Sequence, residues 1–500
     1  MVLLSAGASP SSVDCHGRNA YHWAARMGLY RCFKLMYKHE NNLKESIKCG
    51  NEERMGKCGW RRKDEDGATP LHLSLCASST KCCSFIIENA AISDINSQDA
   101  KKRTPLHWAS AAGNAEGIKL LLRKNAKVDL MDENGKPPFF YAVSSLKHTA
   151  DLCLKILLEN SLGPLNWNDN EGRCALHLAV ADQPDGSEIV KILVKYGKFM
   201  QVRDKVGRTP VHWAAILGKS HTLMILLAHF PDILSSQDEY GANALHYAAM
   251  FNYIEIIEQI TAVDSTSLED EDIKGQAPLL WAVGNNSCVA VQKLINAGAN
   301  IEHLDEAGHS GLHIAVMNGY TECVTLLLQV GAKVNSEDKV GNSPFASACQ
   351  NGCLDIIMYL AKHGAVIETT NSYERKPIHL AAYGGHTLIA DYLIRSGCDI
   401  NCKDIQGLTP LHIACYRGHL DFVSLLSERG AWQNMQDNIG WTPLHYAVYS
   451  NHWEVAQSLL DHCANPNILN KDGKTVLDIC YDAENTMFVN QLLKYGAIKG

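Results

Sequence analysis

The chain has 500 residues, of which 46% are hydrophobic and 20% are charged, and its net charge is −8. This is an ordinary composition for a folded protein, and the acidic balance gives no general case for nucleic-acid binding. Residues 1–66 hold 12 Lys and Arg against 8 Asp and Glu, so the remainder carries −12. We interpret this basic N-terminal region and the acidic run Glu269–Asp272 as solvated faces. No apolar stretch reaches the ~18 residues of a membrane span, so no membrane span is expected.

The eighteen cysteines are dispersed and form no C-x-x-C motif. Residues 1–8 lack the basic start of a secretory signal, so we expect reduced thiols in a cytoplasmic compartment. Cys49 and Cys58 lie near His39, but an eight-residue spacer is not a zinc-site spacing. The sequence therefore predicts neither a metal site nor a cofactor.

One short pattern, an apolar residue usually followed by histidine, occurs fourteen times along the chain. The copies are Tyr21-His22, Leu71-His72, Leu106-His107, Phe139-Phe140, Leu176-His177, Val211-His212, Leu245-His246, Leu279-Leu280, Leu312-His313, Phe345-Ala346, Ile378-His379, Leu411-His412, Leu444-His445 and Leu477-Asp478. The later copies are 33 residues apart and most of the earlier ones 34 or 35, with longer gaps after His22 and Phe140. We expect a partial repeat and a first full repeat in 1–38, a flexible insertion in 39–63, and a continuous array in 64–500. Because residues 1–8 match the end of a repeat, we also expect a fragment or an alternative start.

The segment Asp404–Asn434 shows what one repeat does. Asp404 and Gly407 predict a tight turn, and Thr409 is a typical helix N-cap. Gly418 is placed to end that first helix in the left-handed conformation, and a second apolar helix follows. Neither helix can bury its apolar stripe alone, so the neighbouring repeat must cover it.

The recurring histidines number ten of the 22 in the chain. One imidazole per repeat, about 10 Å from the next, is too widely spaced to share a metal ion. We therefore predict buried histidines that tie one repeat to the turn of the next. The tie should be lost where the pattern departs, and those layers are predicted to be weak or bent joints: Phe140, Leu280, Ala346 and Asp478.

A 33-residue period built on T-P-L-H-x-A resembles the ankyrin repeat. The resemblance implies an all-α ankyrin-repeat solenoid of about 14 helix-turn-helix repeats with β-hairpin fingers. It implies a non-enzymatic scaffold that binds other proteins.

Rival functions find little support. Gly473-Lys474-Thr475 resembles the end of a phosphate-binding loop, but Ile468 stands where that loop needs glycine. No G-x-S-x-G, H-E-x-x-H or kinase motif set is present. The alternative to a signalling scaffold is a generic cytosolic adaptor, such as a substrate receptor for ubiquitination or a regulatory subunit.

Several irregular repeats resemble the inversin family of ciliary ankyrin proteins, which belongs to the nephrocystins. The matching segments are 165–173 (LNWNDNEGR), 176–182 (LHLAVAD), 208–218 (RTPVHWAAILG), 241–249 (GANALHYAA) and 281–284 (WAVG). The resemblance implies partners among nephrocystin-type ciliary proteins, a ciliary kinase and dishevelled, a role in Wnt signalling, and a cytoplasmic location associated with the cilium or cytoskeleton. The calmodulin-binding tail of that family has no counterpart after Gly500, so calmodulin binding is not carried over.

Aromatic residues recur four positions after the signature in three consecutive late repeats. Aromatic and arginine side chains are common anchors of protein interfaces, so we predict a partner-binding groove in residues 371–450. The predicted contact residues are Tyr373, Arg375, Tyr383, Ile405, Tyr416, Arg417, Ile439, Trp441 and Tyr449. The alternative for the tyrosines is that they only cover the neighbouring helix.

Two lesser candidates remain. Ile216, Tyr240, Met250 and Phe251 form a second apolar patch, for which a purely structural role is favoured. Asn401, with Leu393 and Asp399 before it, has the spacing of ankyrin asparagines that an oxygenase hydroxylates, and ordinary turn chemistry is the competing interpretation.

Overall fold

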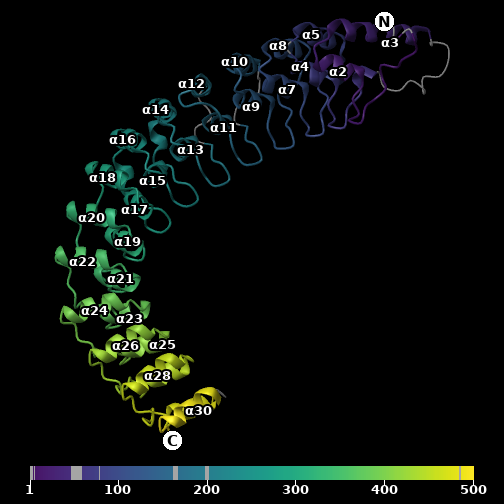
Figure 1. The fold of residues 1–500 in the computed structure, drawn as a ribbon. Coiled ribbons are helices and arrows are strands. Elements are labelled where there is room, and N and C mark those ends of the chain that lie inside the picture. The colour runs from purple at the N-terminus through teal and green to yellow at the C-terminus, as the bar shows by residue number, and fades with distance from the viewer. Residues whose placement is uncertain are drawn as a thin grey trace. The chain divides into compact units, whose positions relative to one another are not determined.

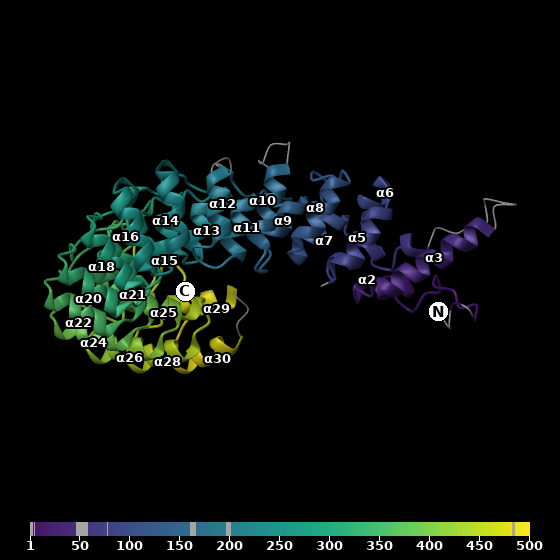
Figure 2. The same cartoon turned by 90° about the horizontal axis from the view of Figure 1, so that it is seen from above.

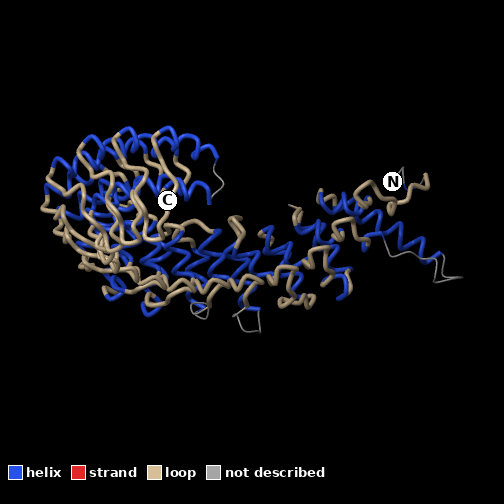
Figure 3. The backbone as a smooth tube through the Cα atoms, turned by 90° about the horizontal axis from the view of Figure 1, so that it is seen from below, coloured by secondary structure: helices blue, strands red, loops and turns tan. Residues whose placement is uncertain are grey.

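The computed structural model describes residue 4 and residues 6–46, 59–77, 79–160, 167–196, 202–482 and 486–500. The chain divides into two compact units, Met1–Ala244 with Ala262–Asp264, and Leu245–Thr261 with Ser265–Gly500. Each unit is a stack of antiparallel helix pairs (Figure 1). In the described residues no segment is a strand (Figure 3), and two isolated bridges join Val13 to Asn19 and Leu304 to Ser310.

The first unit contains six helix pairs. Their helices are α2 (Ala20–Arg26), α3 (Tyr30–Ser46), α4 (Pro70–Leu75), α5 (Thr80–Asn89), α7 (Pro105–Ala112), α8 (Ala115–Arg123), α9 (Pro138–Val143), α10 (Ala150–Asn160), α11 (Ala175–Asp182), α12 (Glu188–Tyr196), α13 (Pro210–Ile216) and α14 (Ser220–His229). Short turns of helix accompany them at η2 (Gly59–Arg61), α6 (Ile92–Ile95) and η3 (Pro231–Ile233).

The second unit holds eight pairs, which brings the described total to the fourteen that the sequence predicts. The helices are α15 (Ala244–Met250), α16 (Ile254–Val263), α17 (Pro278–Gly284), α18 (Cys288–Asn296), α19 (Gly311–Met317), α20 (Thr321–Gln329), α21 (Pro344–Asn351), α22 (Leu354–Lys362), α23 (Pro377–Gly384), α24 (Thr387–Arg395), α25 (Pro410–Arg417), α26 (Leu420–Glu428), α27 (Pro443–Tyr449), α28 (Trp453–Asp461), α29 (Val476–Asp482) and α30 (Thr486–Lys494), with η4 at Thr266–Glu269. In this unit the first helices α19 to α25 line the inner side of the curve and the second helices α20 to α26 the outer side (Figure 1).

The specimen repeat folds as its sequence predicts. The Thr409 side chain accepts a hydrogen bond from His412 N at the start of α25, and Gly418 ends the helix at φ 80°. Leu411, Ala414 and Cys415 are buried on α25, as are Phe422, Val423 and Leu426 on α26. Small residues on the first helix allow the neighbouring helices to approach closely.

The fingers between repeats are tight turns that the chain closes by hydrogen bonds. Asp404 N donates to Leu408 O at 2.9 Å, and the Asp404 carboxylate accepts from the backbone N–H groups of Gln406 and Leu408. Neighbouring fingers are joined at their tips, since Ile405 N donates to Tyr373 O and Asn438 N to Gln406 O, both at 3.0 Å. The predicted fingers are therefore hairpin turns stacked side by side.

The predicted insertion at 39–63 begins inside a helix. The helix α3 is 17 residues long and continues to Ser46 (Figure 2). Glu40 accepts hydrogen bonds from Tyr21 OH at 2.7 Å and from Gly59 N at 2.9 Å, so its carboxylate joins the two ends of the segment. Residues 47–58, with Cys49 and Cys58, lie outside the described residues.

Candidate protein-binding surface

Three first helices carry the candidate surface: α23, α25 and α27. Each begins with proline at its first position, where the missing N–H costs no hydrogen bond. Each carries its tyrosine at the C-terminal end of the helix. Tyr383, Tyr416 and Tyr449 are 41%, 50% and 63% exposed, and we call them the tyrosine surface. This exposure leaves part of each ring open to a partner, and its use as a contact stays a prediction.

The tyrosine nearest the middle of the chain is held by a cation. The Arg417 guanidinium lies 4.3 Å from the centre of the Tyr383 ring. Such a contact at an exposed site contributes about 0.5–1 kcal/mol. It restricts both side chains and presents a flat aromatic face together with a positive charge.

The other end of the surface is an aromatic cluster around Trp441. The Trp441 ring lies 5.3 Å from Tyr449 and 5.1 Å from Tyr446, and Tyr446 lies 6.0 Å from Tyr416. These are edge-on or tilted packings, which aromatic rings favour. The cluster links two of the three tyrosines into one pre-ordered patch.

Tyr446 is the residue of this cluster that the sequence analysis missed. Its hydroxyl donates to Asp437 Oδ2 at 2.7 Å, and burial together with that hydrogen bond raises the pKa of Tyr446. The signal was available, because several repeats carry Trp or Tyr directly after the signature histidine.

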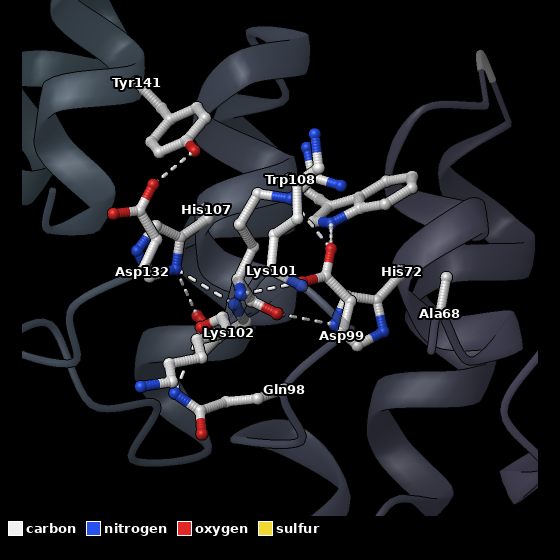
Figure 4. Close-up of polar contacts among 12 residues, drawn as sticks. Ala68, His72, Gln98, Asp99, Lys101, Lys102, His107, Trp108, Asp132 and Tyr141 are labelled. Carbon is white, nitrogen blue, oxygen red and sulfur yellow. Dashed lines mark hydrogen bonds and ion pairs between the residues drawn. The ribbon is translucent and has the colours of Figure 1, made fainter. Parts of the chain in front are cut away.

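The same contact is repeated in the first unit. Trp108 Nε1 donates to Asp99 Oδ2 at 3.0 Å, and Tyr141 OH donates to Asp132 Oδ2 at 2.7 Å (Figure 4). Burial acts to raise the pKa of Asp99, but hydrogen bonds led by that from Trp108 outweigh it and the pKa is lowered. An aromatic residue nine positions after the finger aspartate thus fastens the finger to the helix that follows it.

The predicted finger residues lie at the tips next to the tyrosine surface. Tyr373, Ile405 and Ile439 are 53%, 54% and 54% exposed. Arg375 lies 5.7 Å from the Tyr373 ring and pairs with the buried Asp404 carboxylate at 3.1 Å. Three apolar side chains and one fixed arginine are therefore presented by consecutive fingers.

The signature histidines lie away from this surface and are buried, as predicted. In the layer of His412, Nδ1 accepts from Thr409 N at 3.0 Å, so Nε2 carries the proton and donates to Trp441 O at 3.1 Å in the next repeat. Burial lowers the pKa of His379, His412 and His445 to about 4. His379 and His412 are structural ties between repeats. His445 Nδ1 accepts from Thr442 N at 3.1 Å, but its Nε2 makes no hydrogen bond within the described residues.

The expectation that the tie is lost without histidine is wrong at Asp478. Its Oδ2 accepts from Thr475 N at 2.9 Å, Thr475 Oγ1 at 2.9 Å and Gly500 N at 3.0 Å. Burial acts to raise the pKa of Asp478, but hydrogen bonds from Thr475 and Gly500 lower it. A carboxylate replaces the imidazole because it can accept the same helix-start bond and a second bond from the chain beyond.

A second set of hydrogen bonds between repeats, which the sequence did not predict, is made by His386 and His419. His419 Nε2 bonds to Tyr383 O at 3.1 Å, and His386 Nε2 bonds to Gln350 O at 2.9 Å, each across a repeat boundary. The rings pack on glycines that end the preceding first helices, and a Cβ at Gly385 would lie 2.6 Å from His419 Nδ1. The helix ends that carry Tyr383 and Gln350 are therefore fixed by the next repeat.

The residues of the second apolar patch are divided between the two units, and Asn401 belongs to the second unit. In the first unit Tyr240 is 50% exposed and Ile216 is half-buried, and in the second unit Phe251 is 43% exposed and Met250 is half-buried. Asn401 is half-buried, and its Oδ1 accepts from Trp432 N at 2.8 Å in the next repeat.

The Asn401 bond belongs to a recurring set. Asn335 Oδ1 accepts from Val366 N at 2.9 Å, and Asn434 Oδ1 accepts from Asn465 N at 2.8 Å. The turn role of Asn401 is therefore explained by its contacts, and its hydroxylation stays a prediction.

Within the described ranges, no group of three or more His, Cys, Asp or Glu side chains could hold a metal ion. None of the helices described is both long and apolar enough to cross a membrane.

A family model described as ankyrin repeats in three copies matches the chain in overlapping segments. They are residues 40–132, 118–204, 184–272, 263–338, 279–371, 312–404, 378–470 and 432–499. Together these segments run from residue 40 to residue 499, which is well over half of the chain.

The chain is also similar to known proteins over part of its length. Inversin of Canis lupus familiaris is 32% identical over 327 residues, covering 51% of this chain and 28% of that protein, and human inversin is 32% identical with 51% and 29% covered. The human transient receptor potential cation channel subfamily A member 1 is 26% identical over 347 residues, covering 60% of this chain and 29% of the channel. The predicted inversin resemblance is thus confirmed, and the match spans less than a third of the length of these relatives. The crystal structure of the human ASB11 ankyrin repeat domain is 31% identical, with 41% of this chain and 91% of that one covered at a TM-score of 0.38.

Proposed function

Because this chain belongs to the ankyrin-repeat family, we propose that it is a non-enzymatic scaffold whose main partner site is the tyrosine surface with its adjoining fingers. The observation that carries the proposal is the set of three exposed tyrosines at a 33-residue spacing. Arg417 orders Tyr383, Tyr446 packs on Tyr416, and Trp441 packs on Tyr449. Rigid aromatic residues lose little conformational entropy on binding, and arginine and aromatic residues supply most interface hot spots.

The site has a defined chemical character. It offers aromatic faces on the helices, two isoleucines at the finger tips, and the cations Arg375 and Arg417. A partner segment with apolar side chains and one or two carboxylates would complement it. The proposed contact residues remain those predicted from the sequence, with Tyr446 added as their support.

The similarity to inversin supports a proposal about the partners. We propose an inversin-like role in ciliary and Wnt signalling complexes in the cytoplasm, with nephrocystin-type proteins, a ciliary kinase or dishevelled as partners. The relatives are much longer than the matched region, so this concerns what the repeat array binds.

The test compares the 500-residue chain with the Tyr383→Ala/Tyr416→Ala/Tyr449→Ala variant against these three classes of purified partner. Loss of a hot-spot side chain costs about 2 kcal/mol or more, so we expect at least ~30-fold weaker binding by the triple variant. A Met358→Ala/Leu388→Ala variant is the control, because these side chains are 47% and 73% exposed on the second helices.

Each outcome separates the two parts of the proposal. Partner binding by the triple variant at wild-type affinity, with its helical circular dichroism unchanged, would refute the tyrosine surface. Failure of the wild-type chain to bind any of the three partner classes would refute the ciliary assignment and favour a generic adaptor.

A further inference from the structure

Two cysteines of neighbouring repeats meet in the second unit. Cys288 is the first residue of α18 and Cys323 is the third residue of α20. Their sulfur atoms are 2.8 Å apart, although the residues are 35 positions apart in the chain. A disulfide has an S–S length of about 2.05 Å, so closing the bond requires the sulfurs to approach by less than about 1 Å.

A third side chain holds this pair in place. Asn286 Oδ1 accepts from Cys323 Sγ at 3.2 Å and lies 3.6 Å from Cys288 Sγ. Asn286 has a φ of +56°, a conformation that asparagine tolerates better than most residues. Both thiols therefore approach the same atom, the amide oxygen of Asn286, which is held by a loop residue with positive φ.

The two thiols differ in access to solvent. Cys323 is fully buried, and burial raises its pKa. Cys288 is half-buried and lines a cleft of about 470 Å³ between α18 and α20, together with Val289, Gln292 and Leu326. A small oxidant can therefore reach Cys288 from the outer layer of helices, while Cys323 is shielded behind it.

We propose that Cys288 and Cys323 form a reversible disulfide that staples two neighbouring repeats when the protein meets a peroxide. Cys288 is the residue that reacts first and Cys323 is the residue that resolves the product. The site is independent of the proposed partner surface and of the identity of any partner.

The Cys288 thiolate attacks one peroxide oxygen, an S–O bond forms, the O–O bond breaks, and the departing hydroxide takes up the thiol proton as water. Cys323 sulfur then attacks Cys288 sulfur, an S–S bond forms, and the sulfenic hydroxyl leaves with the Cys323 proton as a second water. Two sulfurs lose two electrons in total and hydrogen peroxide gains them.

The bond would connect the starts of two stacked helices. Because the cross-link closes a loop of 35 residues in sequence, it removes conformations from the unfolded chain and stabilises this pair of repeats. Thiol reductants would reverse it.

The experiment treats the reduced 500-residue chain with equimolar hydrogen peroxide, blocks the remaining thiols with an alkylating reagent, and maps the digested peptides by mass spectrometry. We expect the Cys288–Cys323 peptide pair to be the first cross-link, about 2 Da lighter than the two free-thiol peptides together. Dithiothreitol should abolish it.

Three variants keep the proposal falsifiable. Cys323→Ser should leave Cys288 as a sulfenic acid that a dimedone probe captures, whereas Cys288→Ser should leave Cys323 unoxidised. Cys353→Ser should change nothing, because this half-buried residue at the N-cap position of α22 makes no side-chain capping bond and provides a matched cysteine in the next repeat. Peroxide oxidation of Cys288 and Cys353 at equal rates, with no cross-link in the wild-type chain, would overturn the proposal.

Discussion

The layers built on His412 and on Ala346 lie two repeats apart in one unit and begin their first helices by different means. In the first layer the imidazole accepts from Thr409 N and also donates to Trp441 O in the next repeat. In the second layer the Ser343 hydroxyl accepts from Ala346 N at 3.2 Å. Both layers satisfy the start of the helix and both reach the next finger. The imidazole does so in the first layer, and in the second the Ser343 hydroxyl lies 3.4 Å from Thr369 Oγ1.

The layer without histidine has a second connection, between its finger and the next one. Asn371 Nδ2 donates to Asn342 Oδ1 at 2.9 Å, which joins two fingers directly. This layer therefore has a direct bond between fingers in addition to the contact of Ser343 with Thr369. Capping the helix and coupling two repeats are thus done by a single imidazole in one layer, and by a hydroxyl together with a pair of finger amides in the other.

Acid should give the largest effect, because it acts on many histidine layers together. Burial lowers the pKa to about 4 at His72, His212, His379, His412 and His445. The unfolded value is near 6.5, so the unfolded chain takes up more protons between pH 6.5 and 4. Stability is therefore full above pH 6.5, falls as the pH drops toward 4, and loses nothing more from these groups below that.

The expected loss at pH 5 is about 2 kcal/mol for each such histidine. Urea unfolding followed by circular dichroism at pH 7.5, 6.5 and 5.0 measures it. The finger carboxylate of Asp99 has a lowered pKa, so it stays ionised between pH 7.5 and 5.0 and does not contribute to the measured loss of stability. Equal urea midpoints at pH 7.5 and 5.0 would contradict the assignment of neutral, bonded rings.

Replacing one histidine should have the next largest effect. His412→Ala leaves the buried Thr409 N–H without its acceptor and opens a cavity at a fully buried position. Together these cost about 3 kcal/mol, and they should be concentrated in α25 and α27. Hydrogen exchange of these helices locates the loss, and Leu388→Ala, at a 73% exposed position, is the control expected to stay within ~0.5 kcal/mol. A loss below about 1 kcal/mol would mean that the tie is dispensable.

These layers show which features of the fold could be predicted from the sequence. A 33-residue period identifies which residues occupy equivalent positions, so it predicted fourteen helix pairs, the caps and the buried histidines. It could not predict that Asp478 would keep the tie, because that depends on the chain folding back to place Gly500 N against the carboxylate.

The candidate surface, too, could be predicted from the sequence only in part. The period predicted that Tyr383, Tyr416 and Tyr449 would share one position, and the exposed side chains agree with this, while partner binding stays a prediction. The stacking of Arg417 on Tyr383 depends on side-chain rotamers, which no period contains. Cys288 and Cys323 escaped notice because their spacing of 35 does not match the repeat of 33.

Asp478 allows the comparison to be made with a carboxylate in place of the imidazole. Asp478→Ala removes the acceptor of three hydrogen bonds, and we expect a loss of about 2 kcal/mol confined to the closing repeat. Because its folded pKa is lowered, the contribution is present above the unfolded value near 3.9 and disappears as the pH falls through the folded value. Hydrogen exchange in α29 and α30 measures the loss.

Asp472→Ala is the matched control, since it removes an exposed acidic side chain from the same repeat. An equal effect of both substitutions would show that net charge matters at this end of the stack and that the bonded carboxylate does not.

The smallest expected effect tests whether capping and coupling are separate. Ser343→Ala removes the hydroxyl that accepts from Ala346 N, and an N-cap of this kind contributes about 1 kcal/mol. Ser310→Ala removes the corresponding hydroxyl in the His313 layer, where His313 Nδ1 still accepts from Ser310 N at 3.2 Å. We therefore expect Ser310→Ala to cost less than Ser343→Ala, measured by thermal unfolding of both variants beside the wild-type chain. The reverse order would mean that the serine hydroxyl matters mainly by orienting the imidazole, at 2.9 Å from Nδ1, and that capping and coupling are one device in the histidine layers.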